Sequence, residues 1–346
     1  MRMFRFKPVD TWFFKEARPM DGFGGMELAS VFPPPPRTLL GALRTAVGDA
    51  HNVDWSSYPQ AYPQLAETLG DAYGYGKLHA KGVFLWRKGE VLYPLPLHIV
   101  HMEKKRFAKM PIGEPVECDL GKMRLPSLPT QDGNRYEIFD NAAWVSAKNI
   151  ARVLEGDTPQ EVFTLDTFIH EESRVGIGRD LQTKTVQEGM LYMTKHLRIE
   201  RDIEIALMLE CPDDLIDRAI VRFGGEGRAA VIEATNAETL PTAMDPKGEV
   251  EGIFFSLLTP AIVDPVKPMG EQVTSACLGK SVREGGFDMA RRRSREARSY
   301  LPAGSTWFVA MDADGAKEFI SQHHDTQIGE EQELGRGRIV CGYWTK

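Results

Sequence analysis

The segment VFPPPPRTLLGALRTAVGDA, which spans Val31–Ala50, changes abruptly from extended to helical character. Its four consecutive prolines cannot lie inside a helix, but they can end an extended segment and lead into a helix. At about 100° per residue, the apolar side chains that follow gather on one half of a helical wheel. These side chains are Leu39, Leu40, Leu43, Ala46, Val47 and Ala50. The segment therefore predicts an amphipathic helix directly after the prolines, with this half packed on a core.

The opposite half of the same helix carries Arg37, Gly41, Arg44 and Gly48, almost in line. One hypothesis is a surface helix with two solvated arginines. The other is a smooth cationic strip, because glycine has no Cβ and lets a phosphate backbone or another chain approach closely. The sequence leaves both hypotheses open.

The composition restricts the class of protein. With 346 residues the chain is long enough for two domains with their own cores. Its net charge of −7 argues against indiscriminate nucleic-acid binding, so a nucleic-acid site would be a local basic surface on an acidic body. No apolar run approaches the ~20 residues of a membrane helix. The start, MRMFRFKPVD, alternates charged and apolar residues and predicts a strand instead of a signal peptide.

The four cysteines, Cys118, Cys211, Cys277 and Cys341, lie far apart and form no C-x-x-C pair. This spacing supports neither a zinc site nor a redox motif. Scattered single cysteines are typical of a reducing compartment, so we expect a cytoplasmic protein.

Several other stretches have the periodicity of strands. GVFLWRKGEVLYPLPL predicts a hairpin, with strands at 83–86 and 91–95, whereas 104–134 predicts a long irregular segment. IEIALMLE predicts a half-buried strand, CPDDLIDRAI a short helix, and VRFGGEGRAAVIEA a glycine-interrupted strand pair. EVEGIFFSLLTP, STWFVAMDA and the end of ELGRGRIVCGYW predict three more strands. Mostly antiparallel strands with few helices indicate an α+β fold.

Two segments combine glycine with basic residues. The stretch 170–200, HEESRVGIGRDLQTKTVQEGMLYMTKHLRIE, places Arg174, Arg179, Lys184 and His196 around Gly176. In ELGRGRIV, glycines at 335 and 337 bracket arginines at 336 and 338. Glycine lets backbone N–H groups reach phosphates, and arginine supplies charge-assisted hydrogen bonds. Both segments are equally compatible with ordinary structure, the first with a charged hairpin and the second with a tight turn.

DMARRRSREARSYLPAG would form a helix that is basic on nearly all sides, which fits either a solvated charge run or a surface for phosphate or an acidic partner. Motifs of common enzymes are absent, including G-x-S-x-G and H-E-x-x-H. CLGKS ends like a phosphate-binding loop, but Thr274 stands where its first glycine should be.

Taken together, an N-terminal strand, WFFKEARPM, a glycine-rich loop, FPPPPRTLLGALR, RVGIGRDLQTKTVQEGMLY and a terminal GRGRIVCGYW resemble the RAMP proteins of CRISPR systems. The resemblance spans almost the whole chain. It is strongest to the third subunit of the type III-B (Cmr) RNA-guided effector complex.

The resemblance implies two ferredoxin-like (RRM-like) modules with long inserted loops: residues 1–200 with a thumb hairpin, and 201–346 with a glycine-rich loop. It implies a non-catalytic subunit without cofactor or metal that acts in antiviral defence. Such a subunit would bind the 5′ tag of the CRISPR RNA and dock the Cas10-type large subunit. Neighbouring RAMP backbone subunits and the target RNA would lie nearby, and no membrane would be involved.

By position, the resemblance also implies residues for RNA or partner contact. They are Arg37 and Arg44 in the first helix, Arg174, Gly176, Arg179, Lys184 and His196 in the thumb-bearing segment, and Gly335, Arg336, Gly337 and Arg338 in the glycine-rich loop. RRM sheets carry exposed aromatic stacking motifs, and this sequence has none that we can identify. Recognition is therefore expected to depend on loops and phosphates.

Two alternatives remain. The chain could be a RAMP endoribonuclease that processes precursor RNA, with His170, Tyr192 and His196 supplying a general base and a stabilising cation. It could also be an unrelated metabolic enzyme, although no cluster of carboxylates or histidines supports a small-molecule site.

Overall fold

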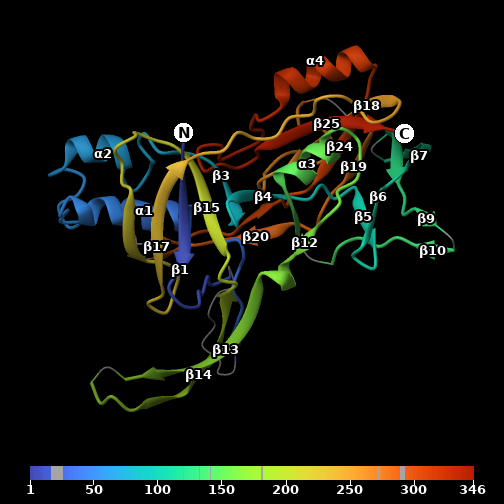
Figure 1. Cartoon of the computed structure of the whole chain (residues 1–346). Coiled ribbons are helices and arrows are strands. Elements are labelled where there is room, and N and C mark those ends of the chain that lie inside the picture. Colours follow the sequence, from blue (N-terminus) through green and yellow to red (C-terminus); the bar gives the residue numbers. More distant parts are fainter. Residues whose placement is uncertain are drawn as a thin grey trace. The chain divides into compact units, whose positions relative to one another are not determined.

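The computed structural model describes residues 1–16, 26–119, 121–131, 133–140, 142–180, 182–270, 273–288 and 293–346. Within these ranges the chain is α+β, as predicted, with four α-helices and mostly antiparallel strands (Figure 1). It forms two compact units, each assembled from three stretches. Unit 1 comprises Met1–His79, Asp166–Asn236 and Arg283–Arg298, and unit 2 comprises Ala80–Leu165, Ala237–Val282 and Ser299–Lys346. The predicted modules 1–200 and 201–346 stay a prediction.

Unit 1 holds two of the helices and a set of long strands. Its elements are β1 (Arg2–Pro8), β2 (Met26–Leu28), α1 (Pro36–Ala50), α2 (Pro63–Leu69), β13 (Ile169–Arg179), β14 (Val186–Ile199), β15 (Ile203–Glu210), β16 (Arg218–Arg222), β17 (Ala229–Asn236), β21 (Phe287–Asp288) and β22 (Arg293–Ser294). Three short elements fall at unit boundaries: η1 (Leu165–Thr167), β20 (Val282–Glu284) and β23 (Arg298–Tyr300).

The sheet of unit 1 is ordered β15-β1-β17-β16, and each neighbouring pair is antiparallel. Phe4 and Phe6 of β1 are fully buried, as their alternation with charged residues predicts. The apolar half of α1 is buried as well, except that Ala50 at its last turn is exposed. The predicted helix and its core-facing half are therefore confirmed.

Two predictions around β15 are wrong. This strand is buried on both faces, because Ala206 and Met208 on its second face are themselves apolar and Glu204 is paired with Arg5 at 3.2 Å. The segment CPDDLIDRAI contains no helix. Instead the side chain of Arg2 binds the Asp213 carbonyl at 2.5 Å, and the segment leads directly into β16.

Unit 2 contains the remaining elements. They are β3 (His79–Arg87, whose first residue is in unit 1), β4 (Glu90–Pro94), β5 (Ile99–Met102), β6 (Arg106–Lys109), β7 (Ile112–Cys118), β8 (Gly121–Pro126), β9 (Thr130–Gln131), β10 (Asn134–Arg135), β11 (Ala143–Ser146), α3 (Ala147–Leu154), β12 (Phe163–Thr164), β18 (Val250–Leu257), β19 (Ser275–Cys277), β24 (Thr306–Ala310), α4 (Ala313–His323) and β25 (Ile339–Thr345).

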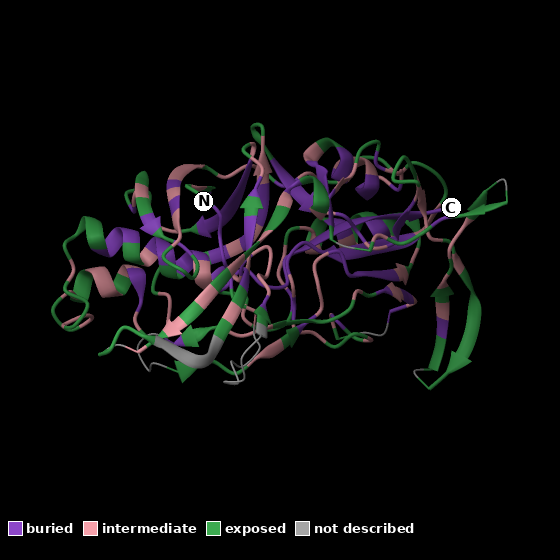
Figure 2. Ribbon diagram, turned by 90° about the horizontal axis from the view of Figure 1, so that it is seen from below, coloured by how far each residue is buried: buried purple, intermediate pink, exposed green. Residues whose placement is uncertain are grey.

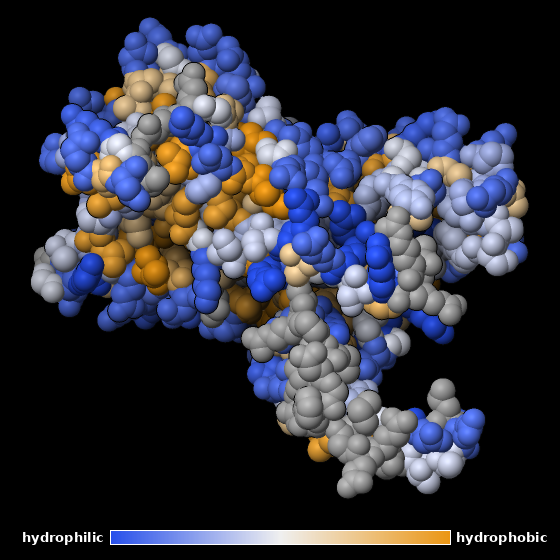
Figure 3. Space-filling view, turned by 180° about the vertical axis from the view of Figure 1, so that it is seen from behind, coloured by the Kyte–Doolittle hydropathy of each residue, from blue (hydrophilic) through white to orange (hydrophobic). Residues whose placement is uncertain are grey.

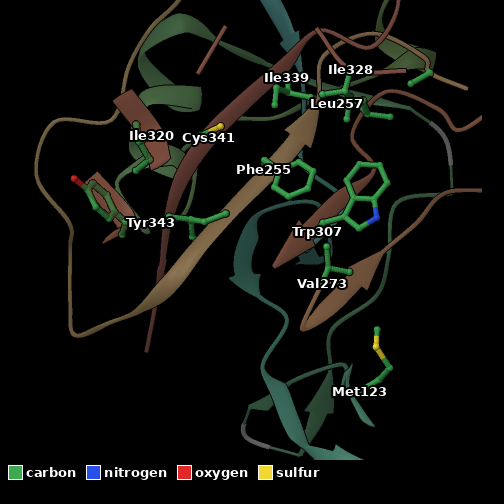
Figure 4. Close-up of a cluster of buried hydrophobic side chains, with 13 residues drawn as sticks. Met123, Phe255, Leu257, Val273, Trp307, Ile320, Ile328, Ile339, Cys341 and Tyr343 are labelled. Atoms are coloured by element: carbon green, nitrogen blue, oxygen red, sulfur yellow. The ribbon is translucent and has the colours of Figure 1, made fainter. Parts of the chain in front are cut away.

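One sheet of unit 2 is ordered β19-β24-β18-β25, so in chain order its strands lie second, third, first, fourth. Helix α4 connects the third strand to the fourth, and its Ile320 belongs to the same cluster of buried side chains as Phe255, Trp307 and Cys341 of the sheet (Figure 4). The strands β12, β11, β4 and β3 are neighbours in that order, and β3 and β4 form the predicted hairpin.

The segment 104–134 was predicted to be irregular, and this prediction is wrong. The segment contains β6, β7, β8, β9 and part of β10. The strands β7 and β8 form a largely exposed hairpin (Figure 2), and the ladder is irregular near Pro115. Met123 is the one buried residue among the described residues of this hairpin, so the hairpin needs no alternating apolar residues and its sequence has no strand periodicity.

Candidate nucleic-acid interfaces

Helix α1 borders a groove of about 700 Å³ in unit 1. Arg37, Gly41 and Arg44 line it from the helix, which places the predicted arginine and glycine strip at an open surface. A Cβ built on Gly41 would meet nothing within 4 Å, so the middle of the strip is unobstructed. Gly48 differs, because a Cβ there would lie 2.2 Å from the Trp55 ring. This glycine provides space for a side chain of the same unit and is buried.

The facing wall of the groove is a tight loop that follows α2. The side chain of Asp71 accepts hydrogen bonds from the backbone N–H groups of Tyr73 at 2.7 Å and Gly74 at 3.0 Å. These bonds, the Tyr73 bond first, lower the pKa of Asp71 and keep it ionised. Gly70 has φ +75°, and a Cβ there would lie 2.2 Å from the Gly74 carbonyl oxygen. The loop is thereby fixed with Tyr73 in solvent, at 80% exposure.

Both arginines of the strip bind this loop. Arg37 donates to the Tyr75 hydroxyl at 2.6 Å, and Arg44 donates to the Asp71 carbonyl at 2.8 Å. Their guanidinium carbons lie 5.9 and 6.0 Å from the centre of the Tyr75 ring. A surface of cations and aromatic rings is thus built from α1 and the stretch 55–75. That stretch was not predicted as part of a site, although its tyrosine-rich segments, YPQAYPQ and YGYG, were a usable signal in the sequence.

The second candidate is the hairpin of β13 and β14, which projects as a long two-stranded arm (Figure 1). Its end is hydrophilic (Figure 3). Arg179 and Lys184 lie there, both exposed, and neither has an ion-pair partner among the residues that the structure describes. Lys184 has φ +59° in the turn, where its N–H bonds the Asp180 carbonyl at 3.0 Å.

At the base of the hairpin, the predicted site residues contact other side chains of unit 1. Arg174 lies 3.3 Å from Glu172 and 3.6 Å from Asp10, and donates to Thr11 at 3.0 Å. His196 is buried, stacks on Phe13 at 5.3 Å, and lies 3.3 Å from the Thr11 hydroxyl. Burial, and then the nearby arginines, lower the pKa of His196, so its ring is neutral at physiological pH.

Gly176 is paired across the hairpin with Tyr192, and a Cβ on this glycine would lie 2.2 Å from the tyrosine ring. The glycine therefore makes room for an aromatic side chain of the same hairpin. One face of the arm carries an exposed apolar stripe made of two cross-strand pairs, Val175 with Met193 and Ile177 with Leu191.

The glycine-rich loop lies inside unit 2. The N–H groups of Gly335 and Gly337 donate to the carbonyls of Gln332 at 2.9 Å and Pro260 at 3.2 Å. Arg338, 3% exposed, bonds Asp325 at 2.5 Å and the Lys81 carbonyl at 3.2 Å. Arg336, also 3% exposed, lies 4.4 Å over the Tyr300 ring. These groups hold the turn before β25 in place.

The residues of the endoribonuclease hypothesis are not brought together. His170 is paired across the ladder with Arg198, six positions along β14 from Tyr192, which corresponds to roughly 20 Å of extended strand. His170 instead bonds Glu200 at 2.8 Å, and His196 is buried. Among the residues that the structure describes, no group of three or more His, Cys, Asp or Glu side chains could hold a metal ion.

The basic stretch 288–300 is not a helix in its described part, since β22 and β23 lie there. Arg295 forms an ion pair with Asp288 at 3.1 Å, while Arg291 and Arg292 lie outside the described residues. The predicted glycine-rich loop at 21–25 also lies outside them.

Comparison with known proteins identifies the family. The model of the CRISPR-associated protein family Cas_Cmr3 matches residues 4–344. The chain belongs to this family. It is similar to the CRISPR system CMR subunit Cmr3 of Saccharolobus solfataricus, with 22% identity over 320 residues that cover 88% of this chain and 85% of that protein.

Chains in two solved structures of Cmr complexes have a similar fold. A chain in the cryo-EM structure of the Type III-B Cmr-beta bound to cognate target RNA and AMPPnP matches with a TM-score of 0.51 and 19% identity, covering 88% of this chain and 85% of that one. A chain in the structure bound to cognate target RNA alone matches with a TM-score of 0.51 and 18% identity, covering 94% and 90%. No helix in the described part of the chain is long and apolar enough to cross a membrane.

Proposed function

We propose that the chain is a non-catalytic subunit of a type III-B CRISPR effector complex that binds the 5′ tag of the CRISPR RNA and docks the Cas10-type large subunit. Its membership of the Cmr3 family supports this assignment, as does its fold, shared with a chain of a Cmr assembly that is bound to target RNA. Neighbouring RAMP subunits and the target RNA would lie nearby in such an assembly, and its location would be the cytoplasm.

The observation that carries the proposal is the β13–β14 arm with Arg179 and Lys184 at its exposed end. On a chain of net charge −7, RNA binding needs local cations that are not neutralised by nearby carboxylates. Phosphate contacts of this kind position the protein on its nucleic acid without reading its sequence. The arm would therefore hold the backbone of the RNA.

The predicted residues then divide into two roles. Arg37, Arg44, Arg179 and Lys184 would contact RNA directly, because each lies at an accessible surface. The other predicted residues would act through the contacts described above. The base of the arm would be shaped by Arg174, Gly176 and His196, and the turn before β25 in unit 2 would be held by Gly335, Arg336, Gly337 and Arg338.

We also propose that β18, β19, β24, α4 and β25 form a ferredoxin-like module in which a loop replaces the first helix. The support is the strand order second, third, first, fourth, with α4 joining the last two strands.

The test of RNA binding uses the assembled complex. Arg179→Ala combined with Lys184→Ala should reduce the CRISPR RNA that co-purifies with the complex. Arg218→Ala combined with Arg222→Ala removes two exposed cations from the edge strand β16 and serves as the matched control. Unchanged RNA retention in the first variant would contradict the role of the arm. Site-specific, metal-independent cleavage of repeat RNA by the purified chain would contradict the non-catalytic assignment.

A further inference from the structure

The groove beside α1 collects large apolar side chains that folding leaves in solvent. Trp55, Tyr73 and Phe287 are 42%, 80% and 55% exposed, and all three line this one groove. Exposed aromatic rings gathered in one place are typical of a binding surface, because burial in a core would otherwise be favoured.

The charges of the groove select the class of ligand. Among the described residues that line it are three arginines, Arg37, Arg44 and Arg295, and two acidic residues, Asp71 and Asp288. The carboxylate of Asp71 faces the backbone N–H groups of its own loop, and that of Asp288 faces Arg295. Arginine beside aromatic rings is the combination that binds single-stranded nucleic acid, where rings stack on bases and guanidinium groups contact phosphates.

The shape of the groove favours a flat ligand. At Gly41 the surface of α1 is open, and a base or a sugar-phosphate chain can lie directly against the helix. The backbone of the loop opposite is fixed by the hydrogen bonds of Asp71, so the position from which the Tyr73 side chain projects is set before binding. A loop that is already ordered loses less conformational entropy when it binds.

We propose that this groove binds one or two unstacked nucleotides of single-stranded RNA, with Tyr73, Trp55 and Phe287 as stacking surfaces and Arg37 and Arg44 at the phosphates. The inference rests on the proposed RNA-binding function and adds base stacking at a site away from any sheet face. It supplies the aromatic contacts that are missing from an RRM-type sheet.

The test uses the assembled complex reconstituted with CRISPR RNA that carries 2-aminopurine at single positions along the 5′ tag and the adjacent guide. Stacking on an aromatic ring quenches this base. At one or two positions we expect quenching that Tyr73→Ala removes and Tyr73→Phe retains. Since loss of one stacked base costs about 1–3 kcal/mol, Tyr73→Ala should also weaken RNA binding about 5- to 160-fold.

A second variant tests the groove without removing an aromatic ring. Gly41→Leu fills the open floor and should also abolish the quenching, whereas Ile220→Ala changes a 73% exposed side chain on β16 and should change nothing. Normal quenching and affinity in both Tyr73→Ala and Gly41→Leu would overturn the inference. Loss of a protein subunit from either variant, with RNA quenching intact, would also overturn it. If the unmodified complex retains no RNA, the proposed function itself fails.

Discussion

Single residues in this protein have roles that their motif alone does not determine. In GRGR, glycine and arginine predict either a loop open to phosphate or a tight turn, and the N–H groups of Gly335 and Gly337 bond carbonyls of unit 2. Gly41, by contrast, lies at an open surface. The difference depends on what packs against each glycine. Contacts with residues distant in sequence, such as Pro260 with Gly337 and Gly82 with Gly335, decide it and are not encoded in local spacing.

Gly337 should be intolerant of a side chain. It has φ +69°, and a Cβ there would lie 1.8 Å from the Ile328 carbonyl oxygen. Gly227 has a similar φ of +66° but nothing within 4 Å of a Cβ. We expect Gly227→Ala to lower the free energy of unfolding by about 1–2 kcal/mol through backbone strain alone. Gly337→Ala should lower it by more, because it adds a clash. Thermal unfolding of both variants measures this, and equal losses would contradict the packing at Gly337.

His98 should make stability depend on pH. Burial lowers the pKa of His98 from 6.5 to about 3, and its ring packs on Phe254 at 4.6 Å. Between these pH values the unfolded chain binds a proton that the folded chain does not, so stability falls as pH falls. The slope from this residue is at most about 1.4 kcal/mol per pH unit. His98→Phe should flatten urea-unfolding free energies between pH 6.5 and 4, and His51→Phe, at an exposed site, should not.

At the scale of elements, periodicity was informative wherever one face of a helix or strand is buried and the other is not. It predicted α1 and β1, because their apolar residues recur at helical or strand spacing. The β3–β4 hairpin was predicted from two apolar runs, at 83–86 and 91–95, that flank the turn residues RKGE. Periodicity was misleading for β7 and β8, which are largely exposed and have no regular pattern. It was also misleading for β15, which was predicted to be half-buried but is buried on both faces. The aromatic loop after α2 was not predicted, because a turn has no sequence period. In addition, the position of Tyr73 depends on a hydrogen bond from its backbone N–H to the Asp71 side chain.

Two glycines of α1 allow a matched pair of substitutions, because Gly41 lies at an open surface and Gly48 packs against Trp55. Gly41→Ala should raise the free energy of unfolding by about 0.5–1 kcal/mol, since alanine favours helix and the position is open. Gly48→Ala should lower it, because the new Cβ would displace the Trp55 ring. Chemical denaturation compares the two directly. A gain in both variants would mean that Trp55 does not pack on the helix.

At the scale of the whole molecule, net charge and local charge act in opposite directions. The net charge of −7 repels RNA at long range, and binding depends on a few exposed cations. Each cation that neutralises a phosphate of single-stranded RNA contributes about 0.7 to the slope of log affinity against log salt. Replacing Arg179 and Lys184 by alanine should therefore reduce this slope by about 1.4. A titration of the complex at several salt concentrations measures it, and an unchanged slope would exclude phosphate contacts by these residues.

The central position of β1 has a consequence for synthesis of the chain. This strand leaves the ribosome long before its neighbours β15 and β17, which begin at Ile203 and Ala229. Until those residues emerge, Phe4 and Phe6 have no sheet to enter, and the apolar side of α1 is equally uncovered. A nascent chain of this protein must therefore shield these apolar segments, by a chaperone or by transient contacts, until the residues from Ile203 onward have been made.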